Sequence, residues 1–111
     1  MEEHTRHVGV LLVSLHVPQA QSLKDKRMVL RSIKDKVRAH YNVSVAELDG
    51  QDKWQTATLG FAAINRDQSY LDGQLSNVLS LIERHAAGAL VCEHKIEFHK
   101  FYVTIAALCP I

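Results

Sequence analysis

The sequence of residues 22–41 is SLKDKRMVLRSIKDKVRAHY, and this stretch decides the fold. Its apolar side chains fall on one side of a helix at about 100° per residue. The hydroxyl of Ser22 can accept a hydrogen bond from the backbone N–H of Asp25 and begin that helix, while Pro18 ends the segment before it. The stretch therefore predicts an amphipathic helix that covers a sheet. Its apolar positions are Leu23, Leu30, Ile33, Val37 and Tyr41.

Five basic residues line up beside this apolar side, because they recur at steps of three and four residues. Such a row can follow a phosphate backbone, since Lys and Arg provide affinity for nucleic acid that does not depend on base sequence. The alternative is a solvated helix face on which Asp25 and Asp35 are the partners of these cations. We call this row the basic stripe, and it consists of Lys24, Arg27, Arg31, Lys34 and Arg38.

Lys26 points instead into the apolar side of the helix, where its long side chain must reach solvent or meet a carboxylate. Three carboxylates, those of Glu47, Asp49 and Asp52, lie near one turn of the chain. They could hold a hard cation such as Mg²⁺. We favour a structural ion pair between Glu47 or Asp49 and a basic residue of the helix, Lys26 or Arg27. Buried basic groups need such partners.

The rest of the chain predicts short strands and a second amphipathic helix. Gly73 lies inside that helix and costs about 1 kcal/mol relative to alanine, which the apolar side outweighs. Residues 49–55 form a turn between two strands, and residues 101–111 are a further apolar piece that could add a strand. The strands are expected at 8–17, 42–48, 56–65 and 89–99, and the second helix at 67–87.

The order β-α-β-β-α-β predicts an α+β fold, a ferredoxin-like two-layer sandwich with an antiparallel sheet. Right-handed crossovers then give the strand order 4-1-3-2. The whole chain, residues 1–111, is expected to be one domain. Its core spans about residues 8–99, residues 100–111 are a C-terminal extension, and residues 1–6 are a loose polar end.

The sheet face away from the helices is also expected to be apolar. Val10 and Leu12 lie on it, together with one parity of residues 56–65, either Ala57, Leu59, Phe61 and Ala63 or the residues between them. A large bare apolar patch is uncommon on a monomer. We therefore expect a second copy of the chain, forming a homodimer, or the C-terminal extension to cover this face.

The formal net charge of +1 gives the molecule no overall attraction for nucleic acid, so any such binding must be local. The two cysteines lack metal or redox spacing, which indicates a reducing compartment, and Cys92 is expected to be a small core residue. The seven histidines also lack metal-ligand spacing. No signal peptide or membrane span is apparent, so we expect a cytoplasmic protein without membrane contacts.

An enzyme is not favoured by the sequence. The ferredoxin-like fold also hosts acylphosphatases and metallochaperones, so the fold does not select a function. The loop at residues 17–21 has neither a glycine-rich anion cradle with arginine nor a pair of cysteines for a metal. No nucleophile and base can be grouped from the sequence. We therefore assign no catalytic residue, no metal site and no cofactor.

Three blocks of sequence resemble the YlxP-like bacterial proteins. They are Ser22-Leu23-Lys24-x-Lys26-Arg27, then Asn42-Val43-Ser44-Val45-Ala46-Glu47-x-Asp49, then Gln51-Asp52-x-Trp54-Gln55 with Leu59-Gly60. The resemblance covers about residues 8–96 and implies a ferredoxin-like domain. The genes of these proteins commonly lie among those for translation and ribosome maturation. The resemblance supplies no catalytic residues.

Two functions follow as expectations. The first is an accessory protein that associates with RNA or the ribosome through the basic stripe. The second is a homo-oligomeric module that binds a protein or a small ligand and takes no nucleic acid. Loss of salt-dependent RNA binding after charge reversal at Arg27 and Arg31 distinguishes them.

Overall fold

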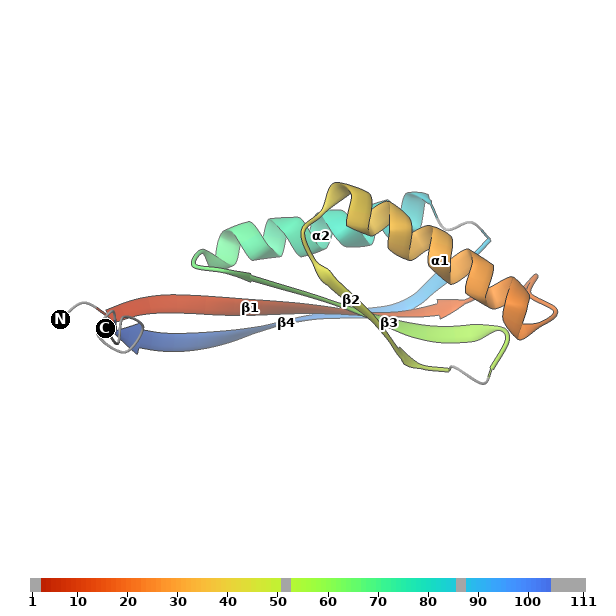
Figure 1. The fold of residues 1–111 in the computed structure, drawn as a ribbon, viewed down its shortest axis with the longest axis horizontal. Helices are drawn as coiled ribbons and strands as arrows, with labels where there is room; N and C mark the ends of the chain where they lie inside the picture. Colours follow the sequence, from red (N-terminus) through yellow and green to blue (C-terminus); the bar gives the residue numbers. More distant parts are fainter. Residues whose placement is uncertain (1–2, 51–52, 86–87, 105–111) are drawn as a thin grey trace, which may run out of the picture.

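The computed structural model describes residues 3–50, 53–85 and 88–104. These residues form one four-stranded sheet and two helices (Figure 1). The elements in chain order are β1 Glu3–His16, α1 Leu23–His40, β2 Ser44–Asp49, β3 Thr56–Asn65, α2 Gln68–Arg84 and β4 Leu90–Thr104.

The sheet has the strand order β2-β3-β1-β4, and every neighbouring pair is antiparallel. From the opposite edge this order is 4-1-3-2, so the predicted ferredoxin-like fold is confirmed. Figure 1 shows α1 and α2 together on one side of the sheet. The two right-handed β-α-β connections place both helices on that side.

The core lies between this side of the sheet and the helices. Alternate residues of β1 point into it, and Leu11 and Val13 have no exposed surface. Their partners across β3 are Phe61 and Leu59, so this parity of β3 faces the helices. Each such side chain contributes about 1.5–3 kcal/mol through burial. The helices supply Leu30, Ile33, Val37, Leu71, Leu75, Val78, Leu81 and Ile82.

We call the other side of the sheet the open face, and it has an apolar half and a charged half. The apolar half comes from β1, β2 and β3, where Ile64 is 70% exposed and Leu48 is 45% exposed. The charged half comes from β4, whose residues on this face pair with Val8, Val10, Leu12 and Ser14. In the order of those partners they are His99, Glu97, Lys95 and Glu93.

β1 and β4 extend beyond the predicted strands and form a long two-stranded ribbon (Figure 1). The prediction of a loose start over residues 1–6 is wrong from Glu3 onward, because Glu3 pairs with Thr104 and Arg6 with Phe101. Backbone pairing depends little on how polar the side chains are, so the hydrophobic pattern gave no signal for it. The rest of the C-terminal extension, residues 105–111, lies outside the described residues.

Each helix begins at a residue whose side chain caps it, and Ser22 is the predicted cap of α1. The Ser22 hydroxyl accepts from the Asp25 N–H at 3.1 Å, and the Asp67 carboxylate accepts from the Ser69 N–H at 3.0 Å. Helix α1 ends where Tyr41 takes an extended backbone conformation. Helix α2 ends at Arg84, three residues before the predicted end.

The prediction that Cys92 is a core residue is wrong, because its side chain is exposed. Leu15 pairs with Val91 and Ser14 with Glu93, so Cys92 is the extra residue of a β-bulge. A bulge shifts the alternation of side chains by one position. Val91 therefore packs against the core in place of Cys92.

Candidate nucleic-acid interface

The basic stripe lies along one flank of α1. All five of its residues belong to that helix, and all are exposed except Lys34, which is half-buried. The buried side of the helix holds Leu30, Ile33 and Val37, which fix α1 against the sheet. A helix rises 1.5 Å per residue, so the stripe runs for about 21 Å from Lys24 to Arg38.

Charge is strongly segregated in this protein. Helix α1 carries seven Lys and Arg residues and two Asp residues, a net charge of +5. The rest of the chain then carries six basic and ten acidic residues, a net charge of −4. The overall charge of +1 therefore hides a cationic helix on an acidic body, and such a local field is what attracts an anion.

The cations of the stripe are not neutralised by neighbouring acids in the described part of the chain. The two ion pairs found there are Lys26–Glu47 and Lys95–Glu97, and neither involves the stripe. Asp25 is occupied locally, because its carboxylate accepts from the Gln21 N–H at 3.0 Å. The alternative interpretation expected Asp25 and Asp35 to pair with these cations, and neither forms such an ion pair in the described residues.

Lys26 has no exposed side-chain surface, and its amine anchors the turn that follows β2. Its Nζ donates to the carbonyl oxygen of Gly50 and, at 3.2 Å, to that of Thr56, and it lies 3.8 Å from Glu47 Oε1. Gly50 has a φ of +85°, and a Cβ there would lie 2.6 Å from Thr56 O. A larger residue at position 50 would therefore clash with the Thr56 carbonyl, and the positive φ also favours glycine.

Gln55 ties the loop before α1 to the start of β3. Its Nε2 donates to Pro18 O at 3.3 Å and to Ala20 O at 3.2 Å. Its own carbonyl accepts from the Val17 N–H at 2.7 Å. Lys26 and Gln55 together hold the N-terminal end of α1 against the sheet.

Of the other two carboxylates predicted to lie near Lys26, Asp49 faces away from it. A bulge between Glu47 and Asp49 places Asp49 opposite Thr58, on the open face. Asp49 there lines a hollow with Ser14 and Thr58. Asp52 lies outside the described residues. Across residues 3–50, 53–85 and 88–104, no group of three His, Cys, Asp or Glu side chains could hold a metal ion.

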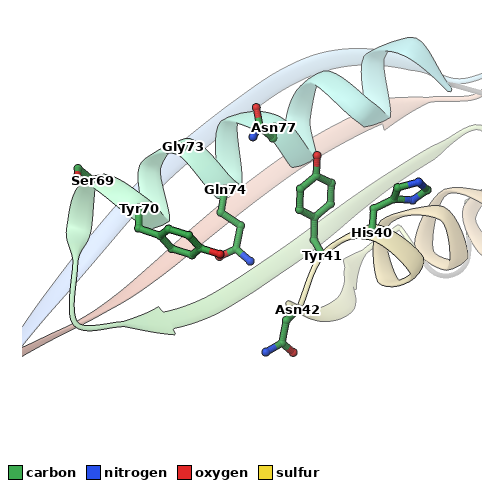
Figure 2. Close-up of a pocket in the computed structure, with 8 residues that line it drawn as sticks. All are labelled: His40, Tyr41, Asn42, Ser69, Tyr70, Gly73, Gln74 and Asn77. Atoms are coloured by element: carbon green, nitrogen blue, oxygen red, sulfur yellow. The ribbon is translucent and has the colours of Figure 1, made fainter.

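A cleft of about 450 Å³ opens between the C-terminal end of α1 and α2. Figure 2 shows Tyr41 rising from the end of α1 toward α2, while Tyr70 and Gln74 extend from α2 toward α1. Tyr41 is half-buried and packs on the core, whereas Tyr70 is 57% exposed. The full lining is His40, Tyr41, Asn42, Ser69, Tyr70, Gly73, Gln74 and Asn77.

This cleft was not predictable from the sequence patterns of the two helices. The sequence pattern places Tyr41 on the apolar side of its helix, and none of the α2 residues of the cleft belongs to the buried side of α2. One signal was present, since Gly73 interrupts α2 between Tyr70 and Gln74. A helix-weakening residue inside a well-formed helix often has a packing or functional reason.

The sequence profile described as "Protein of unknown function (DUF503)" matches residues 8–95. This chain belongs to the DUF503 family. The chain is also 39% identical, over 64 residues, to the "Uncharacterized protein YlxP" of Bacillus subtilis (strain 168). That alignment covers 58% of this chain and 70% of the relative, and the resemblance to YlxP-like proteins is confirmed.

Solved structures share the fold of this DUF503 chain at low sequence identity. SnoaB, a cofactor-independent oxygenase from Streptomyces nogalater, superposes with a TM-score of 0.52 and 14% identity over 81% of this chain and 90% of its own. The de novo designed protein Foldit4 superposes with a TM-score of 0.50 and 13% identity over 84% of this chain and 96% of its own. At these identities the similarity concerns the fold alone.

Several residues that carry the YlxP-like resemblance have structural contacts in this DUF503 chain. Lys26, Glu47 and Gln55 hold the turns at one end of the sheet. Within the described residues, the exposed stripe residues and the cleft residues make no such contacts with these turns. Neither helix in the described residues is long and apolar enough to span a membrane.

Proposed function

We propose that this DUF503 protein binds RNA through phosphate contacts of the basic stripe, as a ribosome- or RNA-associated accessory factor. The observation that carries the proposal is the net charge of +5 on α1, whose stripe has no ion-pair partner among the described residues. Lys and Arg that displace condensed counterions from phosphates gain affinity without reading base sequence. The position of YlxP-like genes among translation genes favours RNA as the polyanion.

The rigidity of α1 supports this role. The N-terminal end of the helix is held by Lys26, and its middle is held by buried Leu30 and Ile33. The stripe cations are therefore presented at fixed spacing along about 21 Å. A preorganised row of cations loses less entropy on binding than a flexible basic segment would.

The test is fluorescence anisotropy with labelled single-stranded and duplex RNA. The double variant Arg27→Glu plus Arg31→Glu reverses two exposed cations and should weaken binding to both RNAs by tenfold or more, since charge reversal adds repulsion to the lost contacts. The matched control is Arg84→Glu plus Lys100→Glu, two exposed cations outside α1. It removes the same charge and should leave binding within about twofold if the contact is local.

Two results would count against RNA binding. The wild-type protein could fail to retain either RNA at low salt. The control variant could also lose as much affinity as the stripe variant, which would mean that net charge rather than α1 determines binding. Circular dichroism spectra of both variants show whether they are folded, which distinguishes a loss of binding from a loss of structure.

A specific observation favours a second function, homodimer formation through the open face. An almost wholly apolar hollow of about 210 Å³ lies on that face, beside the exposed side chain of Ile64. Leu48 and Leu12 line it, and Gly60 forms its base, since a Cβ there would lie 2.8 Å from Leu48 Cδ1. Apolar surface of this kind marks an interaction site.

The occupant we propose is a second copy of this chain. The charged half of the open face alternates acidic and basic residues, with Lys95 between Glu93 and Glu97. A two-fold axis brings the same surface from both copies together, so glutamates of one copy can meet Lys95 of the other in addition to the pair that Lys95 makes with Glu97 of its own chain. A surface with one sign of charge could not pair with itself in this way.

Analytical ultracentrifugation tests the dimer. Ile64→Glu should shift the wild-type dimer to monomer, because it places a carboxylate in the contact. Met28→Glu is the control, since Met28 is similarly exposed at 62% but lies on α1. A wild-type monomer at every concentration would exclude the dimer, and so would a dimer that persists in Ile64→Glu.

A further inference from the structure

The basic stripe ends near the cleft between the helices. Arg38 lies in the last turn of α1, next to His40, Tyr41 and Asn42, which line the cleft. Arg38 and these three residues also line a shared hollow on the outside of the helix end. Arg38 itself does not line the cleft, so a strand whose phosphates follow the stripe to Arg38 must pass around this helix end to place a nucleotide there.

The lining of the cleft is polar and aromatic. It offers two tyrosine rings and the amides of Asn42, Gln74 and Asn77, and it contains no Lys, Arg, Asp or Glu. An amide group has two donors and an acceptor that can match the edge of a nucleobase, and a tyrosine ring can stack on its face. A phosphate would find no Lys or Arg there, and a lipid chain would find no wholly apolar wall.

Gly73 provides an independent argument that the cleft is kept open. A Cβ at this position would meet no atom within 4 Å, so glycine is not needed for packing in the described structure. Glycine inside a helix is nevertheless less favourable than alanine. Gly73 lines the cleft together with Tyr70 and Gln74, and the space beside it is open, so a longer side chain there is expected to occupy part of the cleft.

We propose that the cleft binds an unstacked base of single-stranded RNA, held between Tyr70 and the amide of Gln74. This inference rests on the proposed function, since the basic stripe supplies the phosphate contacts that bring the strand to the cleft. Proteins recognise single-stranded RNA by stacking splayed bases on aromatic side chains and bonding their edges. The cleft volume lies within the range of small-molecule sites.

The test uses the full chain and three variants, with labelled single-stranded RNA and duplex RNA as probes. Tyr70→Ala should weaken binding of the single strand by about fivefold or more, as expected for one lost base–aromatic stack. Tyr70→Phe keeps the ring and should retain most of that affinity. Duplex binding should be unchanged in both, because a paired base cannot enter the cleft.

Gly73→Leu fills the cleft with a residue of higher helix propensity, so lost binding cannot be attributed to a weakened helix. It should reduce single-strand affinity to the same extent as Tyr70→Ala. Ser76→Leu is the matched control, because Ser76 is exposed on α2 and does not line the cleft. It should bind as the wild type does.

The outcomes separate this inference from the proposed function. If the wild type binds neither RNA, both fail. If it binds both RNAs and Tyr70→Ala and Gly73→Leu leave single-strand affinity unchanged, the base site is wrong and the phosphate contacts stand. A free nucleoside monophosphate that shifts the amide signals of residues 70–77 while RNA does not would also overturn the base site, because the cleft would then serve a small molecule.

Discussion

The Nζ of Lys26 lies 3.8 Å from Oε1 of Glu47, with the lysine side chain wholly buried and the glutamate side chain 21% exposed. The same amine donates to the carbonyl oxygens of Gly50 and Thr56. One cation from α1 thus joins the end of β2, the turn after it and the start of β3. These contacts hold the N-terminal end of α1, and with it the start of the basic stripe, against the sheet.

Replacement of Lys26 by Met should strongly destabilise the fold. The methionine keeps most of the buried volume but removes both hydrogen bonds to carbonyls and leaves Glu47 without this cation. Loss of buried charge-assisted hydrogen bonds of this kind costs about 3 kcal/mol. The measurement is the free energy of unfolding from urea denaturation of the wild type and the variant.

The Glu47→Gln variant provides the control for Lys26→Met. Glu47 is partly exposed, and its amide replacement can still accept a hydrogen bond, so its cost should be clearly smaller. The double variant then gives the coupling between the two side chains. An unfolding energy for Lys26→Met within 0.5 kcal/mol of the wild type, about the range of a surface substitution, would show that the buried amine does not hold this turn.

The amphipathic pattern of residues 22–41 and the order of the strands were sufficient to predict the fold, because periodicity reports which face each element buries. The two β-bulges could not be predicted in this way. They move Asp49 to the open face and Cys92 out of the core, and a bulge is an extra residue that interrupts the alternation of side chains. The extension of β1 to Glu3 also escaped prediction, since it depends on backbone pairing with β4.

The candidate site was predictable only in part. The basic stripe follows from the spacing of cations on one helix, and the structure places all five on α1. The cleft depends on how the end of α1 meets α2, and residues such as Tyr41 and Gln74 are more than thirty positions apart in the sequence. No local pattern encodes such a contact.

The same substitution at two glycines should change stability in opposite directions. Gly73→Ala should stabilise the protein by about 0.5–1 kcal/mol, because helix propensity improves and the new Cβ meets nothing. Gly9→Ala should destabilise it by about 1–3 kcal/mol, because its Cβ would lie 2.8 Å from Leu75 Cδ1 in the core. Thermal and urea denaturation of the two variants test this, and equal signs would contradict the packing described for β1 and α2.

Lowering the pH should weaken the N-terminal cap of α2, because the capping group is the carboxylate of Asp67. The Ser69 hydroxyl and backbone N–H both donate to Asp67, and these bonds hold the pKa of its carboxyl below the ordinary aspartate value. A lowered folded pKa gives stability that is present above the unfolded pKa and is lost as the pH falls through the folded pKa. Below about pH 4 the midpoint of thermal unfolding should therefore fall less steeply in Asp67→Asn than in the wild type.

The asparagine keeps a capping side chain, so the two proteins should have similar stability at neutral pH. An NMR titration of the Asp67 carboxyl carbon gives the direct check on the assignment. A pKa at or above that of an unfolded aspartate would show that the cap does not depend on charge. The same slope of midpoint against pH in both proteins would lead to the same conclusion.

The salt dependence of RNA binding offers the sharpest measurement on the basic stripe. Each phosphate contact contributes about 0.7 to the slope of log affinity against log salt for a single strand and about 0.9 for a duplex. The double variant Arg27→Gln plus Arg31→Gln should thus make the slope shallower by about 1.4 to 1.8 if both side chains meet phosphates. Arg84→Gln, outside α1, should leave it unchanged. A variant that loses affinity with an unaltered slope would place Arg27 and Arg31 away from the phosphates, because counterion release depends only on the charges that contact the backbone.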